Sequence, residues 1–372
     1  MALQKQEIYR ELREVVANGA TASVNGKKVI HLCSNDYLGL SQNVNVIKET
    51  IGSFKEISQC SSRLIAGNHP HLLELEDMLA RHRGTEAALV YPSGYMANLG
   101  VVTALADKNS AVFSDELNHA SIIDACRLSG ATIKVFRHND ATHLGELIRG
   151  VKGRKFVITE GIFSMDGDVS RLQDICSVAR EYKALTIVDD AHGDFIFGAN
   201  FSGVPSMFGV DVDIHVSSLS KGLGCFGGYV AATSRVRKIL INTSRQFIYT
   251  SALPYHLAVA AVSAIPLAKK GDLQRKLQSN VNRYRREMEK LGFILGNSSS
   301  QIIPVIIGRE NLALQCSQEL LKAGVFAQAI RFPTVKKGQA RLRTSITAMH
   351  TAAHLDLAIE AFKQVGKKAG II

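Results

Sequence analysis

The segment 186–222 carries a carboxylate, an imidazole and an amine, each just after an apolar stretch. Asp189 and His192 follow the first stretch, in VDDAH, and Lys221 follows the second, in SLSKG. In open α/β sheets, ligands bind at the edge where parallel strands end. A lysine beside a carboxylate at that edge is what a Schiff-base cofactor such as pyridoxal phosphate (PLP) requires. On spacing alone, an exposed pair of loop residues remains the alternative interpretation.

Each of these side chains suits a different task. A free lysine amine, with a pKa of about 10.4, is a poor nucleophile at neutral pH, and an imine with PLP makes it useful. A carboxylate such as Asp189 favours protonation of the pyridine nitrogen, which strengthens the ring as an electron sink. His192 can hydrogen-bond the phenolic oxygen of the ring, and the hydroxyl of Ser218 can help to hold the phosphate.

Apolar stretches alternate with amphipathic stretches through most of the chain, which predicts a mostly parallel sheet with helices on both faces. Helices are expected over 71–84, which ends at a capping glycine, and over 171–183. Segment 87–106 is typical of strand, turn and helix, with Gly94 and Tyr95 at the turn, where free backbone N–H groups bind phosphate. Further polar residues follow expected strands, namely His119, Glu160 and Ser164.

The N-terminal part does not follow this alternation. Residues 1–18 are expected to form a short amphipathic helix, and residues 22–34 a β segment that turns at Asn25-Gly26. This piece is too small to fold alone, so we expect it to pack on a neighbour or across a dimer interface.

The C-terminal part also differs. From about residue 273, charged helices alternate with short strands, and VFAQAIRF is expected to form one of these strands. This pattern indicates an α+β domain with Arg331, Arg341 and Arg343 on strands or at their ends. We therefore divide the chain into an N-terminal segment, a large PLP-binding domain and a C-terminal domain, with the bounds 1–48, 49–265 and 266–372.

The composition is ordinary for a globular protein, and the pattern of cysteines predicts a cytoplasmic one. Of the 372 residues, 46% are hydrophobic and 21% charged, and the formal net charge is +11. The positive charge suits an anionic substrate or a basic surface, but no Lys/Arg run exceeds three and no zinc-finger spacing occurs, so nucleic acid is not an expected partner. Six scattered cysteines without a CxxC motif indicate reduced thiols, and no signal peptide or membrane span is recognisable.

Eight motifs together resemble the α-oxoamine synthases, a family of fold-type I PLP enzymes. They extend from about residue 30 to the C-terminus and read CSNDYLGL, YPSGYMANLG, DELNHASIID, TEGIFSMDGD, VDDAH, SLSKGLG, YTSALP and ARLRTSITAMHT. The resemblance implies an α/β fold with a mostly parallel, seven-stranded central sheet flanked by helices, plus a small α+β C-terminal domain. It also implies a homodimer with shared active sites.

The resemblance assigns roles to individual residues. Lys221 would be the Schiff-base lysine and the base at the substrate Cα, Asp189 the pyridinium partner, and His119 the residue that stacks on the ring and polarises the thioester. With His192, these residues would be catalytic. The cofactor would also be held by Gly94, Tyr95, Glu160, Ser164, Ser218 and, in the partner subunit's site, Thr250 and Ser251. The substrates would be held by Asn35 and Arg343 at the amino-acid carboxylate and by Arg10, Arg331 and Thr334 in the acyl region.

Within the family, SRLIAG, FRHNDATHL and AIRFPTVKKGQARLR are most similar to the branch that makes 8-amino-7-oxononanoate for biotin. That branch condenses L-alanine with pimeloyl-CoA or a pimeloyl-carrier protein and releases CO2. The alternative is the branch that joins glycine to acetyl-CoA, which KGQARLRT also resembles. A PLP-fold binding protein without activity is a further alternative, which the intact lysine, aspartate and histidines disfavour.

Three positions depart from the family pattern. Ser218 replaces the usual threonine and keeps the hydroxyl, and Tyr255 stands where a second proline is common. DDAHGDFIFG replaces the common DDAHGTGxxG. We expect this last change to lie near the active-site entrance and to affect the acyl preference.

Overall fold

The computed structural model describes residues 11–372, so the predicted role of Arg10 lies outside the described residues. The described chain divides into two compact units, which we treat separately. The sheet unit comprises Asn43–Phe163 and Val169–Lys270. The terminal unit comprises residues 11–42, Ser164–Asp168 and Gly271–Ile372.

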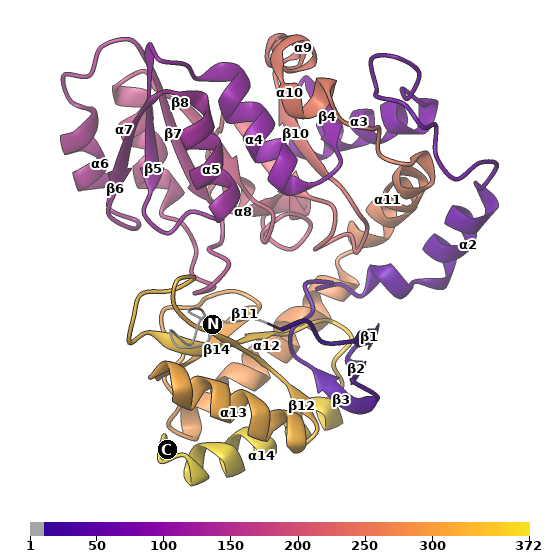
Figure 1. Cartoon of the computed structure of the whole chain (residues 1–372), viewed down its shortest axis with the longest axis vertical. Coiled ribbons are helices and arrows are strands. Elements are labelled where there is room, and N and C mark those ends of the chain that lie inside the picture. Colours follow the sequence, from indigo (N-terminus) through magenta and orange to yellow (C-terminus); the bar gives the residue numbers. More distant parts are fainter. Residues whose placement is uncertain (1–10) are drawn as a thin grey trace. The chain divides into compact units, whose positions relative to one another are not determined.

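The sheet unit is built on a seven-stranded sheet within the described residues (Figure 1). The strand order is β4 (Ala87–Tyr91), β10 (Gly228–Ala232), β9 (Ile214–Ser218), β8 (Leu185–Asp189), β7 (Arg154–Glu160), β5 (Ser110–Asp115) and β6 (Thr132–Phe136). Among these strands, β10 runs antiparallel to both of its neighbours, and the others share one direction. The predicted mostly parallel sheet is confirmed, and the carboxyl ends of β7, β8 and β9 meet at one edge.

Alternate residues of the central strands enter two different hydrophobic cores, because successive side chains of a strand point to opposite faces. On β5, Val112 belongs to one core, and Ala111 and Phe113 belong to the other. On β7, Ile158 and Val157 divide in the same way. The sheet is therefore buried on both faces, as its continuous apolar strands predicted.

Helices supply the other half of each core. The first core receives α4 (Gly94–Leu105), α5 (Ala120–Ser129), α9 (Ser234–Thr243) and α10 (Arg245–Ile248), and the second receives α6 (Ala141–Ile148) and α7 (Leu172–Glu181). The sheet unit also contains α2 (Val44–Gly52), α3 (Pro70–Arg83), α8 (Gly203–Phe208), α11 (Tyr255–Ala268) and a 3-10 turn at Ala199–Phe201. Helices α2 and α3 both pack against α11.

Local sequence signals set the ends of the helices that lead to the site. Helix α3 starts with Pro70, at a position where the backbone N–H would have no partner within the helix, so its absence in proline costs nothing. The helix is capped at its C-terminus by Gly84, whose φ of 68° is left-handed. Helix α4 is capped by Ser93, whose Oγ accepts a hydrogen bond from the N–H of Met96 at 3.2 Å. These features confirm the predicted helix over 71–84 and the strand, turn and helix over 87–106.

The terminal unit holds two further sheets. One has the order β1 (Val15–Asn18), β2 (Thr21–Val24), β3 (Lys27–His31) and β12 (Val325–Phe326), and the other has β11 (Ile302–Gly308), β14 (Ala340–Ser345) and β13 (Gln328–Ile330). Its helices are α12 (Asp272–Lys290), α13 (Glu310–Lys322) and α14 (Ala352–Lys368), with a 3-10 turn at Leu40–Gln42. Asn25 and Gly26, with φ of 48° and 81°, turn the predicted hairpin between β2 and β3. Because β3 pairs with β12, the N-terminal segment packs on C-terminal residues, as expected.

Two predictions in this unit are wrong. Residues 15–18 of the predicted helix 1–18 form β1, which pairs with β2; the β-branched neighbours Val15 and Val16 suit this strand. The segment VFAQAIRF, predicted as one strand, divides at Ala327. Its first part pairs with β3 and its second part with β14, because one stretch of chain contributes to both sheets. The carbonyl of buried Ala327 accepts a hydrogen bond from Ser317 Oγ at 2.7 Å instead of joining a ladder.

Within residues 11–372, no helix combines the length and the apolar character needed to cross a membrane. The six cysteines all lie in this described part, and no disulfide joins them. Cys126, Cys176 and Cys316 are buried, and burial raises the pKa of the Cys126 and Cys176 thiols to about 11. These buried thiols behave as small apolar side chains of the core.

Candidate active site

The carboxyl edge of the parallel strands collects polar residues in the sheet unit. Glu160 ends β7 and Asp189 ends β8, and the two residues lie opposite each other in the parallel register. Ser218 ends β9, and Lys221 follows in the turn after it. The strand directions thus bring together residues that are far apart in the sequence.

Lys221 is in contact with His192 at this edge. Lys221 Nζ lies 3.0 Å from Nε2 of His192, whose side chain is buried. The turn after Lys221 closely approaches the chain that follows His192. A Cβ at Gly222 would lie 2.6 Å from the carbonyl oxygen of Asp194, so this approach requires glycine.

The Asp189 carboxylate is oriented by two donors. Its Oδ2 accepts a hydrogen bond from Asn98 Nδ2 at 2.6 Å, and its Oδ1 accepts one from the N–H of Ala191 at 3.0 Å. Asn98 was missed as a site residue, although it lies within the YPSGYMANLG motif. Its signal in the sequence is a polar side chain on the apolar helix α4, where it is 1% exposed.

His119 caps helix α5 beside this carboxylate. The N–H of Ser121 donates to its Nδ1 at 3.2 Å, so a neutral ring carries its proton on Nε2. Asn118 anchors the preceding loop by donating to the Ile158 carbonyl at 2.9 Å. Burial lowers the pKa of His119 and the negative charge of Asp189 raises it; burial has the larger effect, so the neutral ring is favoured.

Glu160 is buried against the same cluster. Burial, and then the neighbouring charge of Asp189, raise the pKa of Glu160 well above its ordinary value. Its Oε1 atom has no hydrogen-bond partner among the described residues. The site therefore pairs the oriented Asp189 carboxylate with a buried glutamate whose pKa is raised.

Backbone N–H groups and hydroxyls lie together near the start of α4. A Cβ at Gly94 would be 3.2 Å from Cβ of Ser218, and a Cβ at Gly228 would be 2.4 Å from the nitrogen of Gly94. Ser218 Oγ is also 2.8 Å from Ser220 Oγ. The free N–H groups of a helix start, with two hydroxyls beside them, are a donor set that suits a phosphate.

Three of the predicted cofactor residues are placed less centrally. Tyr95 is exposed on the first turn of α4, where its hydroxyl donates to the Asp124 carboxylate. Thr250 and Ser251 follow α10, in a loop tied to the segment before α3 by the N–H of Ala252, which donates to the Ser61 carbonyl at 2.9 Å. Their predicted role concerns the partner subunit and stays a prediction.

The terminal unit brings Arg343, Asn35 and Ser164 together. Arg343 lies on β14, where Nε donates to the Ser164 carbonyl at 2.6 Å and Nη2 donates to Asn35 Oδ1 at 3.3 Å. Its Nη1 donates to Ser345 Oγ at 3.0 Å, and the Tyr37 hydroxyl also donates to Asn35 Oδ1, at 3.2 Å. A guanidinium fork held in this way can bind a carboxylate with two parallel hydrogen bonds.

Arg331 and Thr334 line a groove of about 750 Å³ in the same unit. The groove also has the cationic side chain of Arg13 and an apolar wall that includes Leu314 and Phe326. Arg13 was not predicted as a site residue. Its guanidinium carbon lies 5.8 Å from the centre of the Phe326 ring, and its Nη1 is buried without a hydrogen-bond partner among the described residues.

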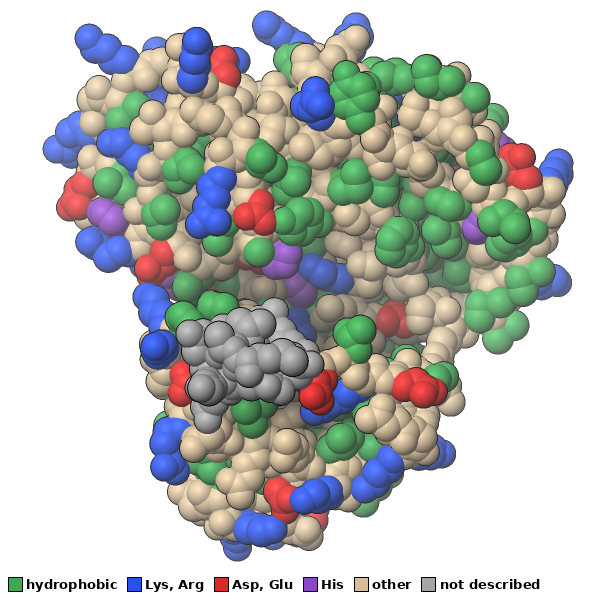
Figure 2. All heavy atoms as spheres, in the orientation of Figure 1, with side chains coloured by type: hydrophobic (Ala, Val, Ile, Leu, Met, Phe, Trp, Pro, Cys, Tyr) green, Lys and Arg blue, Asp and Glu red, His purple; other side chains and the backbone are tan. Residues whose placement is uncertain are grey.

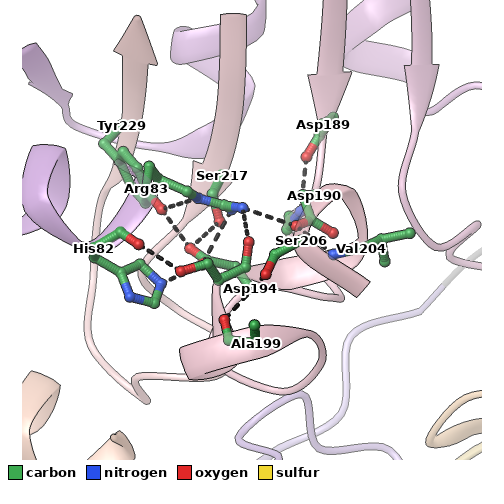
Figure 3. A network of polar contacts seen from close by, with 12 residues as sticks. His82, Arg83, Asp189, Asp190, Asp194, Ala199, Val204, Ser206, Ser217 and Tyr229 are labelled. Atoms are coloured by element: carbon green, nitrogen blue, oxygen red, sulfur yellow. Dashed lines mark hydrogen bonds and ion pairs between the residues drawn. The ribbon is translucent and has the colours of Figure 1, made fainter. Parts of the chain in front are cut away.

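The expectation for DDAHGDFIFG is wrong in one respect. Asp194 does not lie at an entrance: it is 2% exposed and faces the interior of the sheet unit. There its carboxylate contacts His82, Arg83, Ser217 and Tyr229 (Figure 3). An aspartate fits where threonine is common because buried cationic and hydroxyl partners surround it.

The residues of the sheet unit fit PLP by their chemistry. The start of α4 and Ser218 offer donors for the phosphate, Asp189 offers an oriented carboxylate for the pyridine nitrogen, and Lys221 offers a primary amine. The close approach leaves no room for a β-carbon at Gly228 and little room for one at Gly94.

Comparison with known proteins finds relatives that match over the whole chain. The model of the aminotransferase class I and II family matches residues 27–362. The 8-amino-7-oxononanoate synthase of Thermoanaerobacter pseudethanolicus is 41% identical over 100% of this chain and 96% of the relative, and that of Citrifermentans bemidjiense is 40% identical over 100% and 98%. A serine palmitoyltransferase variant from S. paucimobilis, solved with a bound PLP–myriocin aldimine, is 30% identical, with a TM-score of 0.94 over 100% of this chain and 96% of that one.

These relatives match over the whole length of the chain rather than over one unit. They confirm the resemblance, the α/β fold and the dependence on PLP that the motifs implied. The chain belongs to the aminotransferase class I and II family, and within it to the PLP-dependent α-oxoamine synthases.

Proposed function

We propose that this chain is an acyltransferase that condenses L-alanine with a pimeloyl thioester. The products are 8-amino-7-oxononanoate, CO2 and the free thiol. The identity of about 40% to whole-length relatives named 8-amino-7-oxononanoate synthase supports this reaction over others in the family. The observation that carries the chemistry is the contact of Lys221 Nζ with His192 beside the oriented Asp189 carboxylate.

PLP, when bound, supplies an electron sink that stabilises negative charge at the substrate Cα. Asp189 would favour the protonated form of the pyridine nitrogen, and Asn98 and the N–H of Ala191 keep that carboxylate in place. Lys221 Nζ would be the amine that holds the cofactor, and as a free amine it would be the base for the proton at the alanine Cα. His192 Nε2, at 3.0 Å, orients the amine and can exchange a proton with it.

Arg343 is proposed to bind the alanine carboxylate. Its guanidinium is held at Nε by the Ser164 carbonyl, and Asn35 adds an amide beside Nη2. A fixed guanidinium determines the orientation of the amino acid and hence which bond at Cα is broken.

The groove lined by Arg331 and Thr334 is proposed to bind the acyl donor. Apolar residues suit the methylene chain of a pimeloyl group, and Arg13 and Arg331 suit an anionic group at its end or on the donor. The net charge of +11 would favour encounter with CoA phosphates or with an acidic carrier protein.

Product analysis tests the reaction. The PLP-loaded protein is incubated with L-alanine or glycine, each with pimeloyl-CoA, a pimeloyl-carrier protein or acetyl-CoA, and the products are identified by mass spectrometry. We expect 8-amino-7-oxononanoate from alanine with a pimeloyl donor. Product from glycine and acetyl-CoA alone would contradict the proposal and favour 2-amino-3-ketobutyrate synthesis.

We also propose that the enzyme acts as a homodimer. The sheet unit exposes large apolar side chains on and after α2, including Val44, Ile51, Ile57 and Ile65, which are 65% to 83% exposed. Figure 2 shows hydrophobic side chains gathered in the region of α2. An apolar surface of this kind on a globular protein is typical of an interface.

Hybrid dimers test the shared site. A Lys221→Ala protein and a Thr250→Ala/Ser251→Ala protein are each expected to have low activity. After dissociation and mixing, a hybrid would contain one intact site if Thr250 and Ser251 serve the partner subunit. Recovery of up to about a quarter of the wild-type activity is therefore expected, and no recovery would contradict sharing of these residues.

A further inference from the structure

A buried arginine in the sheet unit links two carboxylates that lie on either side of His192. Arg83, at the end of α3, has a fully buried guanidinium, whose Nη1 lies 2.9 Å from Asp190 Oδ2 and whose Nη2 lies 3.1 Å from Asp194 Oδ1 (Figure 3). Asp190 and Asp194 are also joined along the backbone, since the N–H of Asp194 donates to the Asp190 carbonyl at 2.9 Å. The guanidinium thus closes the turn that carries His192.

The same cluster connects this turn to the neighbouring strands. Asp194 Oδ2 accepts a hydrogen bond from Ser217 Oγ on β9 at 2.8 Å and one from the Tyr229 hydroxyl on β10 at 2.5 Å. Arg83 Nε donates to the same Tyr229 hydroxyl at 2.9 Å. His82 completes the shell, with Nε2 at 2.9 Å from Asp194 Oδ1. Because Ser217 precedes Ser218 in β9, the cluster lies directly behind the cofactor residues.

Glycines allow three segments to close on the Asp190 carboxylate. A Cβ at Gly161 or Gly193 would lie 2.4 Å or 2.2 Å from Asp190 Oδ1, and one at Gly203 would overlap Oδ2 at 1.6 Å. Gly161 follows Glu160, and Gly193 follows His192. Any side chain at these positions would push a site residue away, so the glycines and the carboxylate together set where those residues lie.

We propose that Arg83, Asp190 and Asp194 form a positioning clamp, which fixes the 189–194 turn so that Asp189 and His192 meet the cofactor and Lys221. Asp194 stands where the common DDAHGTGxxG pattern has threonine, so the clamp has a second carboxylate here. The inference rests on the proposed roles of Asp189, His192 and Lys221 toward PLP, and not on the identity of the acyl donor.

A purely stabilising role and a positioning role for these ion pairs predict different results for the variants. Loss of a buried partner lowers stability in either case, because it leaves an unpaired buried charge. If the clamp also positions the site, its loss changes the electrostatic environment of Lys221 and the affinity for PLP, because residues that contact the side chains of a site determine how those side chains are oriented. The decisive readouts are the PLP dissociation constant and the pH midpoint of the visible absorbance band of bound PLP.

Asp194→Asn keeps the size of the side chain and removes its charge, and Tyr229→Phe removes one hydroxyl only. For Asp194→Asn we expect the PLP dissociation constant to rise about tenfold or more and the pH midpoint to shift by about one unit. Tyr229→Phe should shift both quantities in the same direction by less. The matched control is Glu76→Gln, which weakens a buried ion pair of α3 outside this cluster, in which Glu76 Oε1 lies 2.7 Å from Arg63 Nη1.

The control should lower the thermal midpoint while leaving the dissociation constant and the pH midpoint within about twofold and about 0.2 units of wild type. The clamp is overturned if the Asp194 and Tyr229 variants behave like this control, with only the thermal midpoint reduced. A Lys221→Ala protein measured in parallel separates the two proposals. If it retains the visible band and its pH midpoint, the assignment of Lys221 fails, whatever the clamp variants do.

Discussion

Lys221 Nζ and His192 Nε2 lie 3.0 Å apart at the carboxyl edge of a parallel sheet. The two residues come from turns that follow different strands, and Gly222 lets those turns approach each other closely. A neutral imidazole at this distance can accept a proton from the amine or orient its lone pair. This pair is the centre of the proposed chemistry, because the same nitrogen is both anchor and base.

Lys221→Ala should abolish turnover. Loss of the anchor and of the base at Cα predicts a fall in kcat of about a thousandfold or more. The visible band of bound PLP should also be lost. Steady-state kinetics and absorbance spectra check both points. Lys238→Ala, which removes an exposed lysine from α9, serves as the control and should keep wild-type values.

Asp189→Asn should impair catalysis more than cofactor binding. The amide no longer favours a protonated pyridine nitrogen, so kcat is expected to fall by about a hundredfold or more. The phosphate donors remain, so the PLP dissociation constant should rise by less than about tenfold. Asp213→Asn removes the acceptor for Thr186 at the other end of β8 and is a fitting comparison. Equal losses in the two variants would argue against the assigned role.

Arg343→Lys should raise the KM for the amino acid. Lysine keeps the charge but cannot hold Ser164, Asn35 and a carboxylate at once, because it lacks the planar fork. We expect KM for L-alanine to rise about tenfold to a hundredfold, with a smaller change in KM for the acyl donor. Arg285→Lys, a half-buried arginine that donates to the Ser298 carbonyl in the same unit, controls for general damage. An unchanged KM for alanine would exclude carboxylate binding by Arg343.

Most of the sheet and its edge could be predicted from the sequence. Apolar strands of a parallel sheet form continuous runs, and polar residues such as Asp189 and Lys221 mark where those runs end. The side chains within one motif are also close in space, as the cap at His119 shows. Local order along the chain was therefore sufficient for most strands of this sheet and for the polar residues at its carboxyl edge, but not for Asn98.

Features that depend on contacts between residues far apart in the sequence could not be predicted from local patterns. Arg83 and Asp194 are brought together only by the fold, so the interior position of Asp194 was mistaken for an entrance. Strand β10 joins the sheet in the opposite direction, which its composition does not reveal. Residues 15–18 were expected to be helical from the pattern of side chains along the N-terminal segment. Their strand conformation instead comes from pairing with β2 in a hairpin, which that local pattern does not reveal.

His350 should make stability depend on pH. Burial lowers the pKa of His350 to about 4, below the value of about 6.5 expected in the unfolded chain. Between these values the unfolded chain binds a proton that the folded chain does not, so the free energy of unfolding falls as the pH falls.

The comparison with His350→Asn isolates this contribution. Between pH 6 and pH 5, the free energy of unfolding of the wild type should fall by about 1 kcal/mol more than that of the variant. Urea unfolding at the two pH values measures the difference. An identical pH dependence in the two proteins would show that His350 does not titrate in this way.

The attachment site of PLP tests the central claim most directly. The PLP-loaded protein is treated with borohydride, which traps the cofactor on the amine that holds it, and the digested peptides are sequenced by mass spectrometry. The account predicts a single phosphopyridoxyl group, on Lys221 in SLSKG. A label on another lysine, or a protein that binds PLP without any trapped label, would contradict it.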